Sequence, residues 1–302
     1  MRSKKDNEPL IDRYVGYLKF EKGLSDNTIS AYTTDLSKLL QFAREESKDL
    51  TKLTPNDLHL FITKLVDLGI NARSRKRILS GVKAFFQYLL IEKYIESNPS
   101  ELIESPRIGL KLPEVLSLEE IDRIIDCVDL SKLEGERNRA IIEVLYSCGL
   151  RVTELCDLKF ADIFPDEGYI RVIGKGDKQR LVPISESALT YIEYYGESRS
   201  LFMNGSKEQD YVFVSRRGKP LTRMMIFNII TKHAELAGVR KKISPHTLRH
   251  SFATHLLERG ANIRVIQQMM GHESITTTEV YLHLDKSTLR EAVLTHHPRN
   301  KK

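Results

Sequence analysis

Apolar residues recur at helical spacing in four segments of the first hundred residues, namely 10–23, 25–46, 54–69 and 72–93. The ends of these segments carry residues that typically begin or end helices. Ser25 or Asp26 can cap the second segment, Thr54 followed by Pro55 can begin the third, and Gly69 can end it. The pattern predicts a bundle of four helices.

Proline and glycine interrupt the pattern over residues 96–117, which predicts an extended linker. Helical periodicity returns at Ser117, where Ser117 and Glu120 have the spacing of a capping box. We place the N-terminal domain at 1–105, the linker at 106–116 and the C-terminal domain at 117–302.

In the second part of the chain the helical spacing of apolar residues gives way once to a pattern typical of strands. Two β-branched runs, 170–173 and 181–184, flank a glycine-containing turn at 174–177, which is typical of a β-hairpin. Residues 136–158 predict one or two helices broken at Gly149, and a helix near 187–195 and a short strand-like run at 211–215 follow. The chain is therefore predicted to be mainly α with a small antiparallel β-sheet, in two domains.

Composition narrows the functional classes. The longest apolar runs are shorter than the roughly 18 residues of a membrane span, and no apolar stretch follows the basic N-terminus as in a secretory signal. Three cysteines at irregular spacing predict neither a disulfide framework nor a zinc knuckle. We expect a cytoplasmic protein that does not interact with membranes.

The net charge of +6 and the pI near 9.0 suit a polyanionic partner, and the excess is divided equally between the two parts of the chain. In the fourth helical segment Arg73, Arg75, Lys76 and Arg77 crowd the first turn, where the helix dipole disfavours cations. A nearby anion would explain them; a solvated basic face is the alternative.

A second candidate anion site lies in "SPHTLRHSFATHLLERG", residues 244–260. Ser244 is a predicted N-cap, and His246, Arg249 and His250 share one edge of the helix that follows. Beside them an apolar stripe through Leu248, Phe252 and Leu256 is expected to hold this polar edge at the domain surface. Helix amides, imidazole and guanidinium together are typical of a phosphate site, although each side chain alone is more often structural.

The next stretch adds further candidates. Asn262 is a predicted cap of a short amphipathic helix that ends at Gly271, and His272 follows that glycine. Tyr281 lies nine residues beyond His272, near the end of another predicted helix. From spacing alone, such a tyrosine is far more often half-buried packing than a catalytic group.

Three sequence motifs of this chain resemble the motifs of a known protein family. "HTLRHSFATHLLERGANIRVIQQMMGHESITTTEVYLHL", "CGLRVTEL" and "IGKGDKQRLVPI" resemble the signature of the tyrosine recombinase (phage integrase) family, from about residue 117 onward. The first hundred residues resemble the helical, SAM-like core-binding domain of that family. The compact length and the "HHP" ending are most similar to the Xer-type recombinases that resolve chromosome dimers.

The resemblance assigns roles to residues of this sequence. The implied catalytic residues are the nucleophile Tyr281, the phosphate-gripping Arg151 and Arg249, the general acid Lys175, and the pocket residues His246 and His272. Glu154 is the implied acidic support of the first arginine. The implied DNA-binding residues are Arg73, Arg75, Lys76, Arg77, Lys83 and Lys178.

These roles agree with the chemistry of the residue types. A phenol of ordinary pKa near 10 needs nearby cations or a base to attack phosphorus, and His246 can accept that proton. Two guanidinium groups can neutralise a developing phosphorane, and a lysine in a hairpin turn can protonate the leaving 5′-oxygen. The reaction would need no cofactor, metal or nucleotide.

Alternatives remain at several positions. Arg151 can cap a helix with Glu154 as its ion-pair partner, and Lys178 competes with Lys175 for the role of acid. His250 and His255 lie near His246, but the zinc-typical HExxH motif and paired cysteines are missing from the sequence, so a zinc site is a minor alternative.

The sequence therefore predicts a site-specific recombinase that cleaves and rejoins DNA through a 3′-phosphotyrosyl intermediate, with resolution of chromosome dimers as its expected role. Its predicted partner is a double-stranded recombination site, on which four subunits assemble around two duplexes with copies of this chain or a paralogue. A septal DNA translocase is an expected activator. The terminal apolar residues Leu289, Ala292 and Val293 predict a short helix. The resemblance implies that this helix docks on a neighbouring subunit, and packing on its own chain is the alternative.

The same residues leave other functions open. A mobile-element integrase or a type IB topoisomerase would share the chemistry, whereas a catalytically silent DNA-binding or architectural protein would bind DNA without the reaction.

Overall fold

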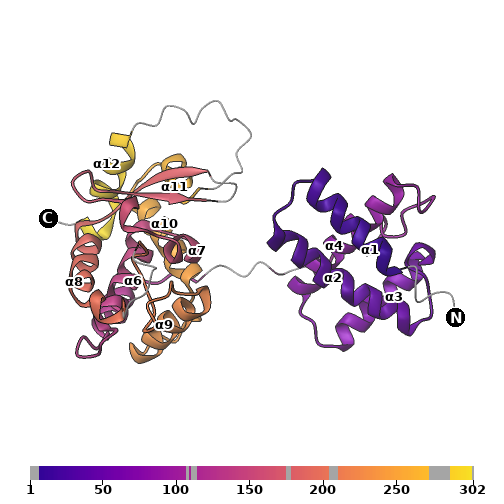
Figure 1. The fold of residues 1–302 in the computed structure, drawn as a ribbon, viewed down its shortest axis with the longest axis horizontal. Helices are drawn as coiled ribbons and strands as arrows, with labels where there is room; N and C mark the ends of the chain where they lie inside the picture. The colour runs from indigo at the N-terminus through magenta and orange to yellow at the C-terminus, as the bar shows by residue number, and fades with distance from the viewer. Residues whose placement is uncertain are drawn as a thin grey trace. The chain divides into compact units, whose positions relative to one another are not determined.

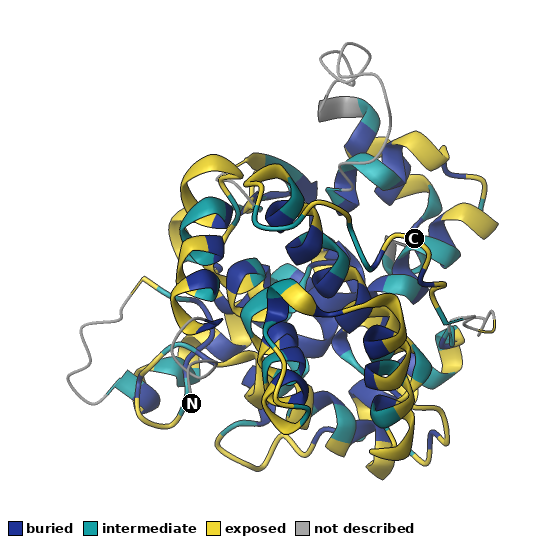
Figure 2. Cartoon of the chain, turned by 90° about the vertical axis from the view of Figure 1, so that its right-hand side faces the viewer, coloured by how far each residue is buried: buried dark blue, intermediate teal, exposed yellow. Residues whose placement is uncertain are grey.

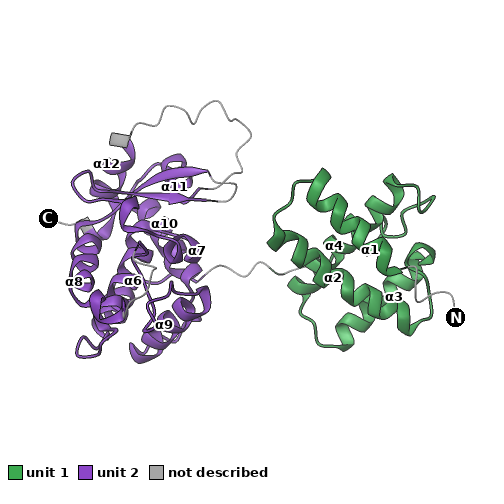
Figure 3. Ribbon diagram, in the orientation of Figure 1, with its two compact units in different colours: residues 1–111 green, residues 112–302 purple. Residues whose placement is uncertain are grey.

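The protein is described by a computed structural model over residues 7–106, 109, 114–174, 178–203, 210–271 and 286–300. The chain divides into two compact units, residues 1–111 and 112–302 (Figure 3). Leu116, inside the predicted linker, is fully buried in the core of unit 2, and Ile103 is buried in the core of unit 1. The core of unit 2 therefore includes a residue of the predicted linker, whereas Ile103 lies within the predicted N-terminal domain.

Unit 1 is helical, as predicted from its four periodic segments (Figure 1). Its elements are α1 (Asn7–Gly16), the π-helical turn η1 (Tyr17–Glu21), α2 (Asp26–Glu45), the 3-10 turn η2 (Leu50–Lys52), α3 (Pro55–Asp67) and α4 (Ala72–Ile91). Ser25 occupies the N-cap position of α2, and the Thr54 hydroxyl accepts a hydrogen bond from the Asp57 amide at the start of α3. The cap chemistry read from the sequence is thus seen at the start of α3, whereas Ser25 takes the cap position of α2 without a side-chain capping hydrogen bond.

The core of unit 1 forms where amphipathic helices face one another. Buried and exposed residues alternate along most helices in Figure 2. Helices α2 and α4 approach closely at Gly81, where an added Cβ would lie 3.2 Å from the Tyr32 ring. Phe85 and Phe86 fill the space beside this crossing and are fully buried. The apolar stripe of α4 therefore fixes where the basic first turn of the same helix is held.

Unit 2 combines helices with a small sheet. Its helical elements are α5 (Leu118–Asp126), α6 (Gly135–Cys148), α7 (Val152–Cys156), η3 (Phe160–Asp162), α8 (Glu186–Met203), α9 (Arg223–Leu236), α10 (Pro245–Glu258), α11 (Ile263–Met270), α12 (Lys286–His296) and η6 (Pro298–Asn300). The strands β1 (Ile163–Phe164), β2 (Tyr169–Ile173) and β3 (Gln179–Pro183) form one antiparallel sheet in the order β1-β2-β3.

The predicted hairpin is confirmed, with Val172 of β2 opposite Arg180 of β3. β1 was not predicted, because two residues are too few to show a period of two. The strand-like run 211–215 forms two isolated bridges, Lys159 with Tyr211 and Val214 with Pro220, in place of a regular strand. α8 is longer at both ends than the predicted helix near 187–195.

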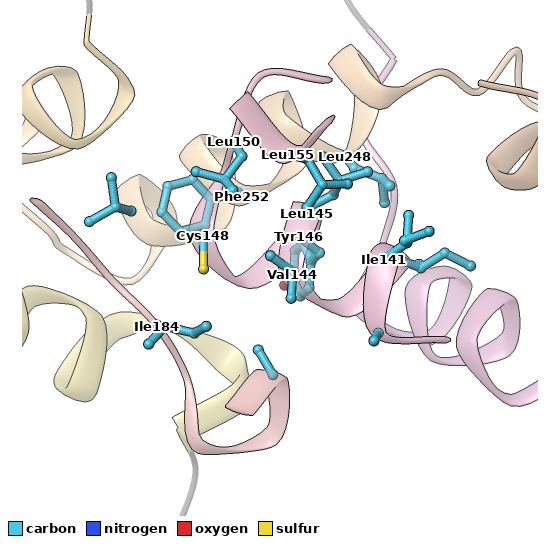
Figure 4. Packing of buried hydrophobic residues seen from close by; sticks show 14 of the residues in the cluster. Ile141, Val144, Leu145, Tyr146, Cys148, Leu150, Leu155, Ile184, Leu248 and Phe252 are labelled. Atoms are coloured by element: carbon cyan, nitrogen blue, oxygen red, sulfur yellow. The ribbon is translucent and has the colours of Figure 1, made fainter. Parts of the chain in front are cut away.

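Helix α6 lies inside the core of unit 2. Every residue from Ala140 to Leu150 is buried, and Figure 4 shows side chains of this stretch packed with Leu248 and Phe252 of α10. Gly149 ends α6 with φ of +58°, and a Cβ there would overlap the Phe252 ring. The chain can therefore turn from α6 into α7 directly beneath α10.

The end of the chain packs on unit 2. α12 contacts β3, α10 and α11, and Leu289, Ala292 and Val293 are buried as predicted for an apolar helix face. Beyond it, the His297 ring is almost fully buried between the rings of Tyr146 and Phe252. In this single chain the helix lies on its own unit; docking on a neighbouring subunit stays a prediction.

None of the helices in the described part of the chain is long and apolar enough to cross a lipid bilayer.

Candidate active site

Arg151 stands at the junction between α6 and α7. It is the N-cap residue of α7, and its amide donates to Glu154 Oε2 at 2.7 Å. Its guanidinium donates to Glu154 Oε1 at 2.8 Å and to the Gly271 carbonyl at 2.7 Å. Arg151 therefore begins a helix with Glu154 as its ion-pair partner, as one of the two interpretations of the sequence expected, and it also reaches the end of α11. Its role toward a phosphate stays a prediction.

Arg249 enters the same place from α10. Its guanidinium donates to the carbonyls of Gly149 and Met270 and lies 3.7 Å from Glu154 Oε2. The expectation that the apolar stripe holds the polar edge of α10 at the surface is right for His246, which is exposed, and wrong for Arg249, which is 5% exposed. The reason is that α10 packs against α6, α9, α11 and α12, so more than one of its faces is covered.

Arg180 of β3 is a third arginine at this place and was not predicted as a site residue. It donates from both terminal nitrogens to the two oxygens of Glu154, at 2.8 and 2.9 Å, and from Nε to the Met269 carbonyl at 2.7 Å. The strand pattern carried a signal for it. Side chains two apart in a strand share a face, so Arg180 lies on the same side as the buried Val182, where an arginine needs a buried partner.

The three arginines meet at the C-terminal end of α11. The carbonyls of Met269, Met270 and Gly271 accept from Arg180, Arg249 and Arg151 in that order. Helix ends leave carbonyls without partners inside the helix, and the negative end of the helix dipole favours cations. Gly271 ends α11 with φ of +60°, as predicted, and a Cβ there would lie 3.2–3.3 Å from the guanidinium groups of Arg180 and Arg151.

Glu154 is the common anion of this cluster. Its side chain is 3% exposed. Burial by itself would raise the pKa of Glu154, but the hydrogen bond and charge of Arg180, and then of Arg151, outweigh burial and lower it. Burial, followed by the charge of Arg151, lowers the pKa of Arg249 to about 10. One carboxylate beside three guanidinium groups gives the cluster a formal charge of +2, which suits a phosphate diester.

The other predicted site residues of unit 2 differ in what the structure says of them. His246 is exposed on the first turn of α10, close in sequence to Arg249, and Ser244 caps that turn through the Thr247 amide as predicted. Lys178 is exposed beside the hairpin turn. Lys175, His272 and Tyr281 lie outside the described residues.

His255, a minor zinc alternative, has a structural partner. Its Nδ1 lies 2.9 Å from the Tyr146 hydroxyl inside the core, and burial lowers the pKa of the imidazole. Within the part of the chain that the structure describes, no group of three His, Cys, Asp or Glu side chains is arranged to hold a metal ion.

The basic cluster of unit 1 lies on the first turns of α4. Arg73, Lys76 and Arg77 are exposed, and Arg75 and Lys83 are half-buried. Arg77 also donates to Asp35 of α2 at 2.7 Å, and the Asp35 side chain is 2% exposed. Arg77 thus joins α4 to α2, in addition to any contact with an anion.

Comparison with known proteins decides the family. The model of the Phage integrase family matches residues 114–288, and that of the Phage integrase, N-terminal SAM-like domain matches residues 11–93. Tyrosine recombinase XerD of Pseudomonas putida is 41% identical over 294 residues, covering 97% of this chain and 98% of that protein.

The chain belongs to the phage integrase family, the tyrosine recombinases. Among solved structures of tyrosine recombinases, the XerH site-specific recombinase bound to difH substrate in a pre-cleavage complex has a TM-score of 0.68 and 25% identity. That match covers 93% of this chain and 82% of the other. A lambda integrase tetramer bound to a Holliday junction shares the fold, with a TM-score of 0.71 and 20% identity over 98% of this chain and 78% of the other.

Three predictions from the sequence are confirmed by these matches. They are the resemblance to Xer-type tyrosine recombinases, the mainly helical fold with a SAM-like and a catalytic part, and the enzyme class, a recombinase of DNA strand exchange. The domain limits and the roles of individual residues are not tested by the comparisons and stay predictions.

Proposed function

We propose that this tyrosine recombinase acts at one double-stranded DNA site and breaks and rejoins single strands there through a 3′-phosphotyrosyl intermediate. Tyr281 attacks the phosphorus, and the leaving 5′-oxygen takes a proton from Lys175. A 5′-hydroxyl of the partner duplex then reverses the attack on the phosphotyrosine. Because each step exchanges one phosphate ester for another, the bond energy is kept and no nucleotide is consumed.

Arg151 and Arg249 bind the non-bridging oxygens of the phosphate in this proposal. Charge builds on those oxygens as the phosphorane forms, so fixed guanidinium forks stabilise the transition state more than the ground state. His246 accepts or relays the proton of the tyrosine, and His272 donates to a phosphate oxygen. Glu154 holds the arginines in place.

One observation carries the proposal. Arg151 and Arg249 come from different helices, yet both contact Glu154 and take adjacent carbonyls, Gly271 and Met270, at the end of α11. His272 is the next residue of the chain. Three residues that the family pattern groups together are therefore tied to one short segment, which supports a common site for them.

The partner of this site is duplex DNA, and we propose that four subunits assemble on two duplexes, as the lambda integrase tetramer bound to a Holliday junction, which shares this fold, suggests. Arg73, Arg75, Lys76, Arg77, Lys83 and Lys178 contact the phosphate backbone in this assembly. The similarity to XerD supports resolution of chromosome dimers as the role, in the cytoplasm and under control of a septal translocase.

A nicked suicide substrate tests the reaction. Duplexes selected from a random-sequence pool by binding to the protein are nicked at successive positions, so that cleavage near a nick releases a short fragment and traps the covalent adduct. We expect an adduct stable in denaturant with the wild-type protein and none with Tyr281→Phe, which keeps its affinity for the duplex. Binding without any adduct across all nick positions would favour the silent DNA-binding alternative.

A further inference from the structure

Arg180 lies in the motif "IGKGDKQRLVPI", but the family resemblance gave it no role. Its side chain is 13% exposed, and it meets both oxygens of Glu154 as a bidentate fork. It reaches the cluster from β3, whereas Arg151 and Arg249 come from the helical side of unit 2. Arg180 therefore joins the sheet to α7 and to the end of α11.

The contacts of Arg180 leave it little freedom. Its Nε donates to the Met269 carbonyl, and added Cβ atoms at Gly271 and Gly174 would lie 3.2 and 3.7 Å from its Nη1. With three donors committed and glycine backbone on two sides, the guanidinium is held in one position. A group held in this way suits the orientation of neighbours better than a direct grip on a substrate.

Glu154 can compete with a phosphate for the two clamp arginines. It is an anion within 2.8 Å of Arg151 and 3.7 Å of Arg249, and a carboxylate offers about four acceptor sites. Arg180 takes one donor contact on each oxygen of that carboxylate. Without it, Glu154 could turn to form a bidentate pair with Arg151 or Arg249, and the donors used in that pair would be lost to the phosphate.

We propose that Arg180 is a positioning residue for strand cleavage: it occupies Glu154 and the α11 end so that the forks of Arg151 and Arg249 stay open toward the scissile phosphate. This inference rests on the proposed function, because it takes Arg151 and Arg249 as the phosphate clamp. It also makes a specific prediction, since a competing carboxylate can be neutralised.

The test uses the full-length protein and the same nicked duplexes. Adduct formation is followed in single turnover at saturating protein, and the Kd for the duplex is measured separately. Arg180→Gln is expected to slow adduct formation roughly 10- to 100-fold, the usual cost of losing a group that orients reactive residues, with a change in Kd below about threefold. Arg180→Lys keeps the positive charge but cannot form a bidentate pair with Glu154. Its rate of adduct formation is expected to lie between those of the wild type and Arg180→Gln.

The decisive variant is Arg180→Gln combined with Glu154→Gln. It is compared with Glu154→Gln alone, because Glu154 also holds the arginines in place. If Glu154 competes with the phosphate, the Arg180→Gln change slows the reaction at least about fivefold less when Glu154 is already Gln than it does in the wild-type protein. A purely structural role of Arg180 predicts the same loss of rate in both backgrounds. Thermal unfolding of each variant, with Arg180→Lys as the mildest change, keeps a folding defect separate from a rate effect.

Arg171 provides a matched control. It lies on the neighbouring strand β2, pairs with Asp162 at 2.7 Å and is not part of the cluster. Arg171→Gln is expected to leave the rate of adduct formation unchanged. An unchanged rate in Arg180→Gln, equal losses of rate and affinity, or the same loss of rate in the wild-type and Glu154→Gln backgrounds would each overturn the role of Arg180. Absence of any adduct with the wild-type protein would instead overturn the proposed function, and this inference with it.

Discussion

The two arginine clusters of this protein differ in what surrounds them. In unit 2 the side chains of Arg249 and Arg180 are 6% and 13% exposed and share one buried glutamate. In unit 1 Arg73 and Lys76 project into solvent, and Arg77 is 53% exposed although it pairs with Asp35. A buried cation has a position fixed by its partners and can act through geometry, whereas an exposed cation acts mainly through its charge and is screened by salt.

The largest effect is expected at Arg249. Arg249→Ala removes one fork of the proposed clamp, and loss of one such donor group typically slows reaction by roughly 10²- to 10³-fold. Suicide-substrate kinetics at saturating protein measure this loss, and affinity for the duplex should change by less than about threefold. Equal losses of rate and affinity would show that Arg249 acts mainly through its charge, as the exposed cations of unit 1 do, and would contradict the distinction between the two clusters.

Glu154 should control stability and its pH dependence. Glu154→Gln leaves the buried Arg249 and the partly buried Arg180 and Arg151 without their shared anion, and we expect a loss of about 3 kcal/mol at neutral pH, measured by urea unfolding. Because folding lowers the pKa of Glu154, its stabilisation is complete above the ordinary value near 4.3 and is lost as pH falls below it. The variant should therefore lose less stability than the wild type in that acidic range; parallel curves would contradict this account.

Arg77 tests whether an exposed cation can also be structural. Arg77→Ala leaves the buried carboxylate of Asp35 without its partner, and we expect about 2 kcal/mol of destabilisation in thermal or urea unfolding. Arg73→Ala, on the same turn and exposed, is the control and should change stability by less than about 0.5 kcal/mol. An equal loss of stability in both variants would show that the ion pair of Arg77 with Asp35 does not stabilise the fold.

The smallest effect per residue is expected for the solvent-facing cations. Arg73→Ala with Lys76→Ala should weaken binding to the duplex and lower the slope of log K against log salt by about 1.8, or about 0.9 for each phosphate contact. The rate of adduct formation at saturating protein should stay unchanged. A lower rate with an unaltered salt slope would show that these residues act through geometry.

Much of this architecture could be predicted from local patterns. Thr54, Ser117 and Ser244 cap the helices expected of them, Gly149 and Gly271 end helices in the left-handed conformation, and the runs beside 174–177 pair as a hairpin. These features depend on neighbours in the sequence, so the sequence reports them directly. The family pattern added the order of Arg151, Arg249 and the residues around them.

Local sequence patterns predict most of the helical segments, the helix ends that carry a cap or a glycine, and the residue types available for phosphoryl transfer; the ends of α8 were not predicted. Tertiary structure alone decided that Arg249 is buried, that Arg77 is tied to Asp35, and that Arg180 joins Arg151 and Arg249 around Glu154. Periodicity describes one element at a time. The partner of a buried charge, however, is chosen by the packing of elements far apart in the chain, where low solvent access makes each pairing obligatory.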